Sequence, residues 1–513
     1  MPQRPTVSSA TETERKYTAG GSASLPDLTG LPRVSVVEVD TVELSAQYYD
    51  TADLRLLQSA ITLRRREGGD DAGWHVKLPN GADTRTELHF PLADADGKSA
   101  DEPPSELMNL LVGVRRGLPV SLAALLTTTR HRHRIRGKDE TLLAEVVEDD
   151  VVAVRGGDDE EMHWQEIEVE AGSSLGRGDR STLLDAIEER LTAAGIVRSP
   201  SPSKVHRVLG DLLPAAPELG EAARFLRDYL ARELHALELS DIAVRRDEPD
   251  AIHSMRKASR RIRSALQTYA DDFALGDALV DELRWFGRRL SPSRDLEVQW
   301  KRLAGQVDEI PGDRHREATK SRIDEYFSAK TGAARTAALA TLDSERYLVM
   351  LRSLDDLVGG LGSTPPARSR KSALDPEKLT RSVATVAKKV DKRVARVRKA
   401  HDPHERDELM HRARKGAKRM RYAIEVIAPL HPKRTARILD RFDEFQDMLG
   451  EFQDSVVSRE HLLDIVSDQG HTAESSFGLG ILYRLETEVG RRQAAQLEPA
   501  WKSALGSAGK LWE

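Results

Sequence analysis

Apolar and polar positions alternate along the first third of the chain. Segments such as "AITLRRRE", "GWHVKLP" and "RTELHFPL" follow a period of two, and turn-like segments such as "EGGDDAG" separate them. This pattern predicts short antiparallel strands up to about residue 172, because alternate strand residues face opposite sides of a sheet. A capped helix is expected over 181–195, and helical sequence then continues to the C-terminus, with a Gly/Pro/Ser-rich break at 359–376. The sequence therefore predicts an α+β multidomain protein whose second part is all helical.

The charged residues of the predicted strands share one phase. In "ETERK", Glu12, Glu14 and Lys16 stand two residues apart, while intervening positions of other strands, such as Leu63 and Val76, are typical of a core. Later strands carry similar rows: Arg64, Arg66, Lys77, Arg85, Glu87, Arg130, Arg132, Arg134, Glu166, Glu168 and Glu170. One layout accounts for all of these rows, namely a closed sheet with a charged lumen and an outer face that packs against helices.

Such a lumen indicates what it would contain. Converging arginine and lysine side chains favour an anion with many oxygens, such as a chain of phosphates. Carboxylates beside that anion would repel it unless a cation lay between them, and ligand sets that contain only oxygen favour Mg²⁺ or Mn²⁺ over Zn²⁺. On this interpretation Glu12 and Glu14 hold a metal ion and Lys16 holds phosphate.

Two segments of the helical part carry the same motif. "HSMRKASRRIRSAL" begins at His253 and "HRARKGAKRMRYAI" begins at His411. At about 100° per residue, each segment places a histidine and three basic residues on one helix face, with apolar residues opposite. We call these two sets the basic stripes: His253, Arg256, Arg260 and Arg263 in the first, and His411, Arg414, Lys418 and Arg421 in the second. A second matching pair of segments aligns Asp295 with Asp454, which predicts a duplicated helical bundle with an approximate two-fold axis.

The basic stripes differ from an ordinary solvated helix face, which is the alternative interpretation. Solvated faces intersperse glutamate with lysine, whereas neither stripe contains an acid. Two like charges about 4 Å apart repel by roughly 1 kcal/mol in water and more where the dielectric is lower. Two such stripes facing one another across a groove would therefore favour a bound polyanion.

Composition narrows the class of partner. The 513 residues include no cysteine, which excludes disulfides and thiolate metal sites. The net charge of −6 and an aromatic content of 5% argue against a nucleic-acid-binding protein. We find no run of about 18 apolar residues and no signal-peptide pattern, so we expect a cytoplasmic protein without a membrane partner. If the chain binds polyphosphate, association with polyphosphate granules is a further expectation.

Several of these segments together resemble two known families. "ETERK", "YYDTADLRLLQSAITLRRRE", "GWHVKLP", "RTELHF", "QEIEVE" and "SKVHRVL" occur in the order of the CYTH domain, the triphosphate tunnel metalloenzymes, over about residues 5–212. "IHSMRKASRRIRSAL", "SPSRDLEVQ", "LMHRARKGAKRMRYAIE" and "FQDMLGEFQDSVV" resemble the CHAD domain, a conserved-histidine α-helical domain, over about 217–510. The two helical repeats would then cover about 217–360 and 375–510.

The CYTH resemblance implies an eight-stranded antiparallel β tunnel that binds triphosphate with basic residues and a divalent metal with carboxylates. The implied phosphate-binding residues are Lys16, Arg64, Arg66, Lys77, Arg85, Arg130, Arg132 and Lys204. The implied metal ligands are Glu12, Glu14, Glu166, Glu168 and an acid from "EVVEDDVV". In that segment Asp149 shares its phase with Glu145, whereas a shift of one residue would select Glu148 or Asp150.

The CHAD resemblance implies that the basic stripes line a groove for polyphosphate. The leading hypothesis is therefore a metal-dependent inorganic triphosphatase, coupled to a polyphosphate-binding module. Its catalytic set would be Glu12, Glu14, Lys16 and Glu168. Two alternatives stay open: a non-catalytic polyphosphate adaptor, and a tunnel that acts on an organic triphosphate as an adenylyl cyclase or thiamine triphosphatase does.

Overall fold

The computed structural model describes most of the chain. The described ranges are residues 8–19, 24–31, 33–92, 102–215, 218–273, 277–361, 376–468 and 470–509. The predicted break at 359–376 therefore lies largely outside the described residues. The chain divides into two compact units, residues 1–215 and 216–513, which we describe separately.

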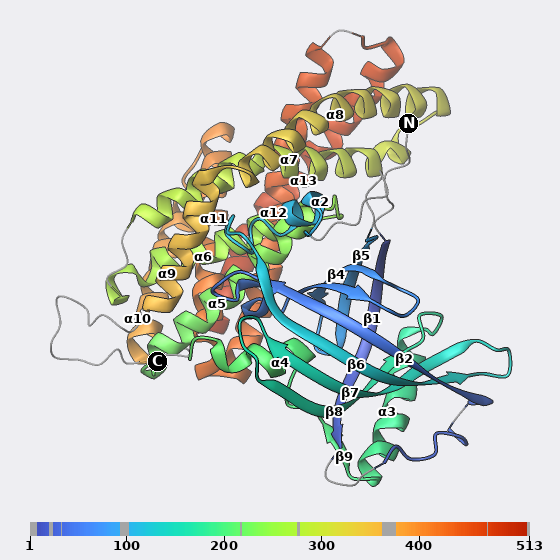
Figure 1. The fold of residues 1–513 in the computed structure, drawn as a ribbon. Helices are drawn as coiled ribbons and strands as arrows, with labels where there is room; N and C mark the ends of the chain where they lie inside the picture. The colour runs from blue at the N-terminus through green and yellow to red at the C-terminus, as the bar shows by residue number, and fades with distance from the viewer. Residues whose placement is uncertain are drawn as a thin grey trace. The chain divides into compact units, whose positions relative to one another are not determined.

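The first unit is built on one antiparallel sheet that closes on itself (Figure 1). Its strands are β1 Ser8–Ala19, β2 Val36–Asp50, β3 Thr62–Glu67, β4 Gly73–Pro79, β5 Thr84–Phe90, β6 Ser121–Arg136, β7 Leu142–Arg155, β8 Glu161–Ala171 and β9 Ile196–Arg198. Their order is β5-β4-β3-β2-β6-β7-β8-β1-β9, and a further pairing of β5 with β1 closes eight of them into a tunnel. The predicted fold class is confirmed, with β9 as an added ninth strand beside β1.

The hydrophobic core of the first unit lies on the outer face of the tunnel. Leu63, Val76 and Leu88 are buried, as the alternating pattern predicted. Helix α3 (Arg177–Ala193) packs on this face, where Ile187 and Leu191 join a cluster that includes residues of β1 and β8. The helix begins four residues earlier than the predicted start at 181. Two short helices that the pattern did not predict, α1 (Arg55–Gln58) and α2 (Ser105–Leu110), lie in the connections.

Strand register decides which charges meet inside the tunnel. In the β1–β8 pair Lys16 lies opposite Glu168, and in the β1–β5 pair Glu12 lies opposite Arg85. Helix α4 (Lys204–Leu209) is capped by Ser203, whose side chain accepts a hydrogen bond from the backbone N–H of His206. The cap fixes the start of α4, and Lys204 is its first residue.

The second unit is all helical, as predicted (Figure 1). Its helices are α5 Glu221–Arg245, α6 Ala251–Phe273, α7 Ala278–Gln306, α8 Asp313–Leu342, α9 Glu345–Gly360, α10 Pro376–Val397, α11 Pro403–Ile427, α12 Pro432–Ser467 and α13 Ala473–Ala508. Within the described ranges, no helix combines the length and the apolar character that crossing a membrane requires.

Helices α6 and α11, which carry the basic stripes, share one core. Met255 and Ile262 on α6 and Met420 and Ile424 on α11 are fully buried in the same cluster, as the helical period predicted. The hydroxyl of Tyr269 on α6 also donates a 2.7 Å hydrogen bond to the backbone carbonyl of α11 residue 423. The apolar faces thus hold the two helices together and leave the stripes on the remaining surface.

Candidate active site

The tunnel encloses a cavity of about 290 Å³ lined mainly by charged side chains. Every residue predicted to bind phosphate lines it: Lys16, Arg64, Arg66, Lys77, Arg85, Arg130, Arg132 and Lys204. Glu12, Glu14 and Glu168 line it too, while Asp149 and Glu166 are buried beside it and contact Lys204. The closed sheet thus brings together the basic and acidic rows that the sequence placed on separate strands.

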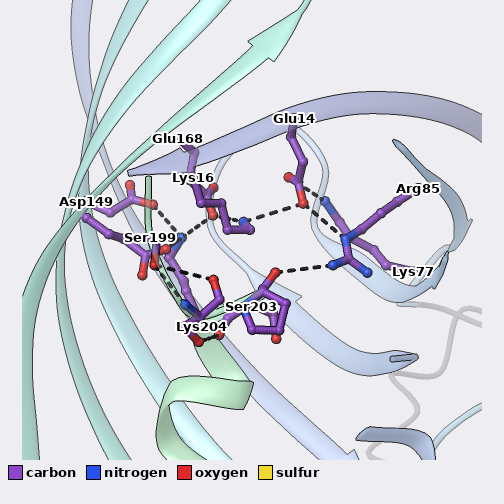
Figure 2. A network of polar contacts seen from close by, with 12 residues as sticks. Glu14, Lys16, Lys77, Arg85, Asp149, Glu168, Ser199, Ser203 and Lys204 are labelled. Carbon is purple, nitrogen blue, oxygen red and sulfur yellow. Dashed lines mark hydrogen bonds and ion pairs between the residues drawn. The ribbon is translucent and has the colours of Figure 1, made fainter. Parts of the chain in front are cut away.

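Three carboxylates form a compact cluster on β7 and β8. Asp149, Glu166 and Glu168 each offer an oxygen, and these oxygens lie within 4.8 Å of one another. The ammonium of Lys204 lies 2.8 Å from Asp149 Oδ2 and 2.8 Å from Glu168 Oε1 (Figure 2). It also lies 2.6 Å from Glu166 Oε1. The fully extended β7 backbone turns the neighbouring acids elsewhere, since Glu148 accepts a hydrogen bond from His133 and Asp150 accepts one from Gln165. Of the candidate acids in "EVVEDDVV", Asp149 is therefore the one that joins the cluster.

The charges of this cluster depend on one another. Burial acts to raise the pKa of Asp149, but Lys204 and Arg130 outweigh it and hold that pKa below its usual value. Arg130 donates two hydrogen bonds to Asp149, from Nε at 2.8 Å and from Nη2 at 2.7 Å, in the bidentate geometry that guanidinium groups favour. Burial likewise acts against the charge of Lys204, and the three carboxylates raise its pKa well above normal. Asp149 and Lys204 are thus both held in their charged forms.

A second acidic group lies on β1. Glu14 Oε1 lies 3.5 Å from Lys16 Nζ and 3.4 Å from Arg85 Nε, and Lys77 Nζ lies 3.8 Å from Glu14 Oε2 (Figure 2). Lys77 also donates a 2.5 Å hydrogen bond to Glu12. Lys16 in turn pairs with Glu168, so it connects this group to the three-carboxylate cluster. The cations of the cavity therefore separate two sets of carboxylates.

Several carboxylates that line the cavity were not in the predicted site, although Glu145 was an alternative to Asp149 as metal ligand. Glu87, Glu145 and Glu170 also line the cavity. Burial, reinforced by a hydrogen bond with Glu87, raises the pKa of Glu12 to about 8. Burial alone would raise the pKa of Glu87 as well, but Lys77 and His75 outweigh it and hold that pKa well below its usual value. The phase of Glu87, two residues from Arg85, was the available signal for its position.

An acidic turn between β3 and β4 meets two of the predicted phosphate-binding arginines. Asp70 lies 3.2 Å from Arg132, and Asp71 pairs with Arg66. The turn is held in place by His75, whose Nε2 lies 2.9 Å from the backbone carbonyl of Asp71. We call residues 68–72 the acidic turn. Burial together with Arg64 and Arg130 lowers the pKa of Arg66 to about 9, which shows how closely the cations crowd at this end of the cavity.

In the helical unit, parts of the two basic stripes converge. Burial, Arg260 and Arg414 lower the pKa of Lys418 to about 6. Burial also lowers the pKa of Arg414, and Arg260 and Arg256 add to the effect against the attraction of Asp454. The two stripes are thus close enough to repel one another, which is the arrangement expected of a polyanion site.

The other members of the stripes differ in their surroundings. Burial, together with Arg294 and Arg260, lowers the pKa of His253 to about 4, and His411 Nδ1 lies 2.6 Å from Gln453 Oε1. Among the described residues, the charges that lower the pKa of Arg263 after burial are all cationic: Arg260, Arg284 and Arg288.

Arg421 departs from the expectation that the stripes are free of acids. It lies 2.8 Å from Glu425 and 2.6 Å from Asp443, because Glu425 follows it by one helical turn and α12 brings Asp443 alongside. Arg256 is also paired, at 3.1 Å from Asp295. In contrast, Arg260, Arg414 and Lys418 form no ion pair with a carboxylate of the described residues, although Asp454 attracts Arg414 and Lys418.

Comparisons with known proteins agree with this architecture. A CYTH domain model matches residues 10–209, and a CHAD domain model matches residues 228–463. The chain is 33% identical over 506 residues to the uncharacterized protein Rv2226 of Mycobacterium tuberculosis H37Rv, covering 95% of both chains. A protein of the same description, MT2285 of strain CDC 1551, matches equally, at 33% identity and 95% coverage of both chains.

Two solved structures are also similar. PptA from Streptomyces chartreusis is 17% identical, with a TM-score of 0.46, over 55% of this chain and 99% of that one. The CHAD domain from the plant Ricinus communis is 22% identical, with a TM-score of 0.45, over 57% of this chain and 97% of that one. Members of the CYTH superfamily are metal-dependent enzymes that bind triphosphates in a tunnel. The chain belongs to the family of proteins in which a CYTH domain is followed by a CHAD domain.

Proposed function

We propose that the tunnel hydrolyses inorganic triphosphate or short polyphosphate with the help of a divalent cation, and that the helical unit binds polyphosphate. The observation that carries the first half is one cavity in which eight basic side chains meet two separate sets of carboxylates. The functional units would be residues 5–212 and 217–510, with helical repeats over about 217–360 and 375–510.

The residues present fit a hard divalent cation. The cluster of Asp149, Glu166 and Glu168 supplies only carboxylate oxygens, which suits Mg²⁺ or Mn²⁺. Glu12 and Glu14 form the separate set of carboxylates on β1 and would serve there as additional cation ligands. When bound, the cation would supply Lewis-acid polarisation of phosphate oxygens and a more acidic water.

The basic residues of the tunnel would hold and orient the phosphate chain. Arg64, Arg66 and Arg130 would donate hydrogen bonds to its non-bridging oxygens, and Lys16 and Lys77 would neutralise charge as it spreads during attack on phosphorus. Because these side chains are already held by strands on several sides of the cavity, little reorganisation would be needed in the transition state.

A carboxylate would accept a proton from the attacking water. Glu14 and Glu168 both line the cavity and both pair with Lys16, which places them next to the predicted phosphate position. In-line displacement would release orthophosphate from the end of the chain. This step needs no serine or histidine nucleophile, and it conserves atoms by adding one water across one phosphoanhydride bond.

The nature of the cavity favours an inorganic substrate over a nucleotide. Among the described residues that line it, Tyr48 is the sole aromatic, and the charged side chains surround a volume of about 290 Å³. An adenine or thiazolium ring would find little apolar surface to stack on. An organic triphosphate stays the second candidate, and a substrate panel separates the two.

The test is phosphate release from tripolyphosphate, ATP and thiamine triphosphate with Mg²⁺ or Mn²⁺. We expect tripolyphosphate to be hydrolysed fastest and Glu14→Gln to lower kcat about 100-fold. Glu43→Gln is the matched control, because Glu43 is exposed on β2, does not line the cavity and accepts a hydrogen bond from Thr129. Equal rates for Glu14→Gln and the wild type would contradict the proposed roles, and no release from any substrate would favour a polyphosphate adaptor.

For the helical unit, the convergence of Arg260, Arg414 and Lys418 supports polyphosphate binding. We expect the double charge reversal Arg260→Glu/Lys418→Glu to abolish retention on immobilised polyphosphate. Undiminished binding by this variant would assign the stripes to ordinary surface.

A further inference from the structure

Helix α10 presents a second cationic surface, apart from the basic stripes. Its Val383, Val390 and Val394 are buried in the helical core. At about 100° per residue, five basic residues occupy an arc of about 140° on another flank of the helix and extend about 12 Å along it. We call them the α10 row: Lys388, Lys389, Lys392, Arg393 and Arg396. All are exposed except Arg393, which is half-buried.

The α10 row lacks the acids of an ordinary solvated face. Asp391, an acid within this part of the helix, lies outside the arc and accepts a 3.0 Å hydrogen bond from Trp501. In the described part of the chain, no carboxylate pairs with the exposed members of the row. Helix α5 precedes α6 in the chain as α10 precedes α11, so α5 is the counterpart of α10. The exposed residues of α5 include both acids and bases, and Arg227 lies 2.6 Å from Asp228. The repeated architecture therefore does not by itself require a basic α10.

The α10 row continues the cationic surface of α11. The two helices touch at Gly416, where an added Cβ would lie 2.8 Å from Arg393 Nη1 and 3.0 Å from Val390 Cγ2. Arg393 also donates a 3.3 Å hydrogen bond to the backbone carbonyl of Arg412. A Cβ at this position would displace the end of the Arg393 side chain and crowd Val390, so the glycine favours the approach that brings the α10 guanidinium against α11.

Around α11, basic side chains continue from the stripe to this contact, accompanied by an exposed acid, Glu408, which pairs with Arg412 at 3.0 Å. The helical period gives the rotation of each residue about the axis of α11, measured from His411. Lys415 is rotated by about 40°, Arg412 by about 100° and Gly416 by about 140°. Lys415 and Arg412 are both exposed. Arg263 of the first stripe and Arg412 both act to lower the pKa of Lys415, after burial, so the three charges are neighbours. The stripes, Lys415, Arg412 and the α10 row form one path.

We propose that a polyphosphate chain bound between the stripes leaves the convergence over Lys415 and Arg412 and continues along the α10 row. This inference rests on the proposed function of the helical unit. It makes α10 a site that long chains reach and short chains do not, so the protein would prefer long polyphosphate.

Other polyanions fit the row less well. The aromatic side chains on which single-stranded nucleic acid stacks are absent from the arc. A membrane-surface helix needs an exposed apolar face, whereas the apolar side of α10 is buried in the core. A flexible linear polymer with a charge on every unit suits a row of lysines that provides charge without stacking.

The test compares three full-length variants with the wild type. Lys388→Gln/Lys392→Gln/Arg396→Gln removes charge from the α10 row, and Arg260→Glu/Lys418→Glu removes the convergence. Arg314→Gln/Lys320→Gln/Arg484→Gln is the matched control, because these residues are also exposed, at 83%, 62% and 77% of their side-chain surfaces, but lie on α8 and α13. Binding is measured to long-chain polyphosphate, to oligophosphate, to double-stranded DNA and to anionic lipid vesicles.

We expect the α10 variant to bind long-chain polyphosphate about tenfold more weakly and oligophosphate as the wild type does. Its slope of log affinity against log salt should fall by about 2, as three released counterions predict for a single-stranded polyanion. The matched control should keep wild-type affinity, and unchanged thermal unfolding should show that the α10 variant is folded.

The outcomes separate the two proposals. Wild-type affinity of the α10 variant for long chains, with binding lost in the convergence variant, would overturn this inference alone. Equal loss for long and short chains would also overturn it. Absence of polyphosphate binding in the wild type would overturn the proposed function instead. A variant that loses only DNA or vesicle binding would reassign the row to that partner.

Discussion

The ammonium of Lys204 lies 2.6 Å from Glu166 Oε1, at the point where the carboxylates of β7 and β8 converge. A side chain delivered by α4 thus supplies positive charge at the place where the oxygen ligands for a divalent cation are gathered. Lys204 and a bound cation would both relieve the repulsion among Asp149, Glu166 and Glu168. The stability of this region should therefore depend on which cation is present.

The substitution Lys204→Met tests this dependence. Without the ammonium, three carboxylates, two of them buried, lose a partner, and we expect the free energy of unfolding to fall by about 3 kcal/mol in a chelating buffer. Added Mn²⁺ should restore much of this loss, and should raise the unfolding temperature of the variant more than that of the wild type. Lys204→Arg, which keeps the charge, is the control. The same destabilisation with and without Mn²⁺ would exclude a metal ion at this cluster.

Arg130 provides a test of geometry at constant charge. Its two hydrogen bonds to Asp149 use the planar guanidinium, which lysine lacks, so Arg130→Lys should lower kcat/KM for tripolyphosphate about tenfold. Arg155→Lys is the matched control, because Arg155 also pairs with an aspartate through two contacts of 2.8 Å, to Asp211, but does not line the cavity. Equal effects of the two substitutions would show that the two hydrogen bonds from the Arg130 guanidinium to Asp149 have no particular role in catalysis.

The acidic turn should compete with the substrate. Asp70 and Asp71 pair with Arg132 and Arg66, which the phosphate chain would have to displace. Asp70→Asn/Asp71→Asn should therefore lower KM for tripolyphosphate about threefold, since both aspartates are exposed to solvent, and ion pairs screened by solvent contribute about 0.2–1 kcal/mol. The turn between β7 and β8 has the same GGDD sequence and does not line the cavity, so Asp158→Asn/Asp159→Asn is the control. A raised KM would mean instead that the acids help to orient the arginines.

The lowered pKa of Lys418 predicts how polyphosphate binding changes with pH. Because burial and neighbouring cations lower its pKa to about 6, the free protein holds a neutral amine above that pH. A polyanion favours the ammonium, so binding takes up a proton, and affinity should fall as pH rises above about 6. Lys418→Met should flatten this dependence, whereas Lys320→Met, at an exposed lysine that pairs with Asp324, should not. Binding measured from pH 5.5 to about 8 checks both expectations.

The same group affects folding in the opposite sense. The unfolded chain keeps Lys418 protonated up to its usual pKa of about 10.4, while the folded chain releases the proton above about 6. Stability therefore rises with pH between these values, and Lys418→Met should stabilise the free protein by about 1 kcal/mol at pH 7 after allowance for solvent screening. A destabilised variant would show that Lys418 has a structural partner.

Local periodicity determined much of this protein. The period of two placed Arg64 and Arg66 on one face of β3, opposite the core residue Leu63, and the helical period placed Met255 and Met420 in the core beneath the stripes. These assignments needed only the geometry of a single strand or helix, in which the direction of a side chain follows from its position in the sequence.

The tertiary structure decided which side chains of different strands and helices meet. The β6–β7–β8 register selected Asp149 over Glu148 and Asp150, and the closure of β5 onto β1 brought Glu87 to Glu12. The packing of α12 gave Arg421 an acid, Asp443. A one-residue slip of a strand, or a rotation of a helix, would reverse these outcomes without altering any local pattern, because register and packing are fixed by contacts between segments far apart in the chain.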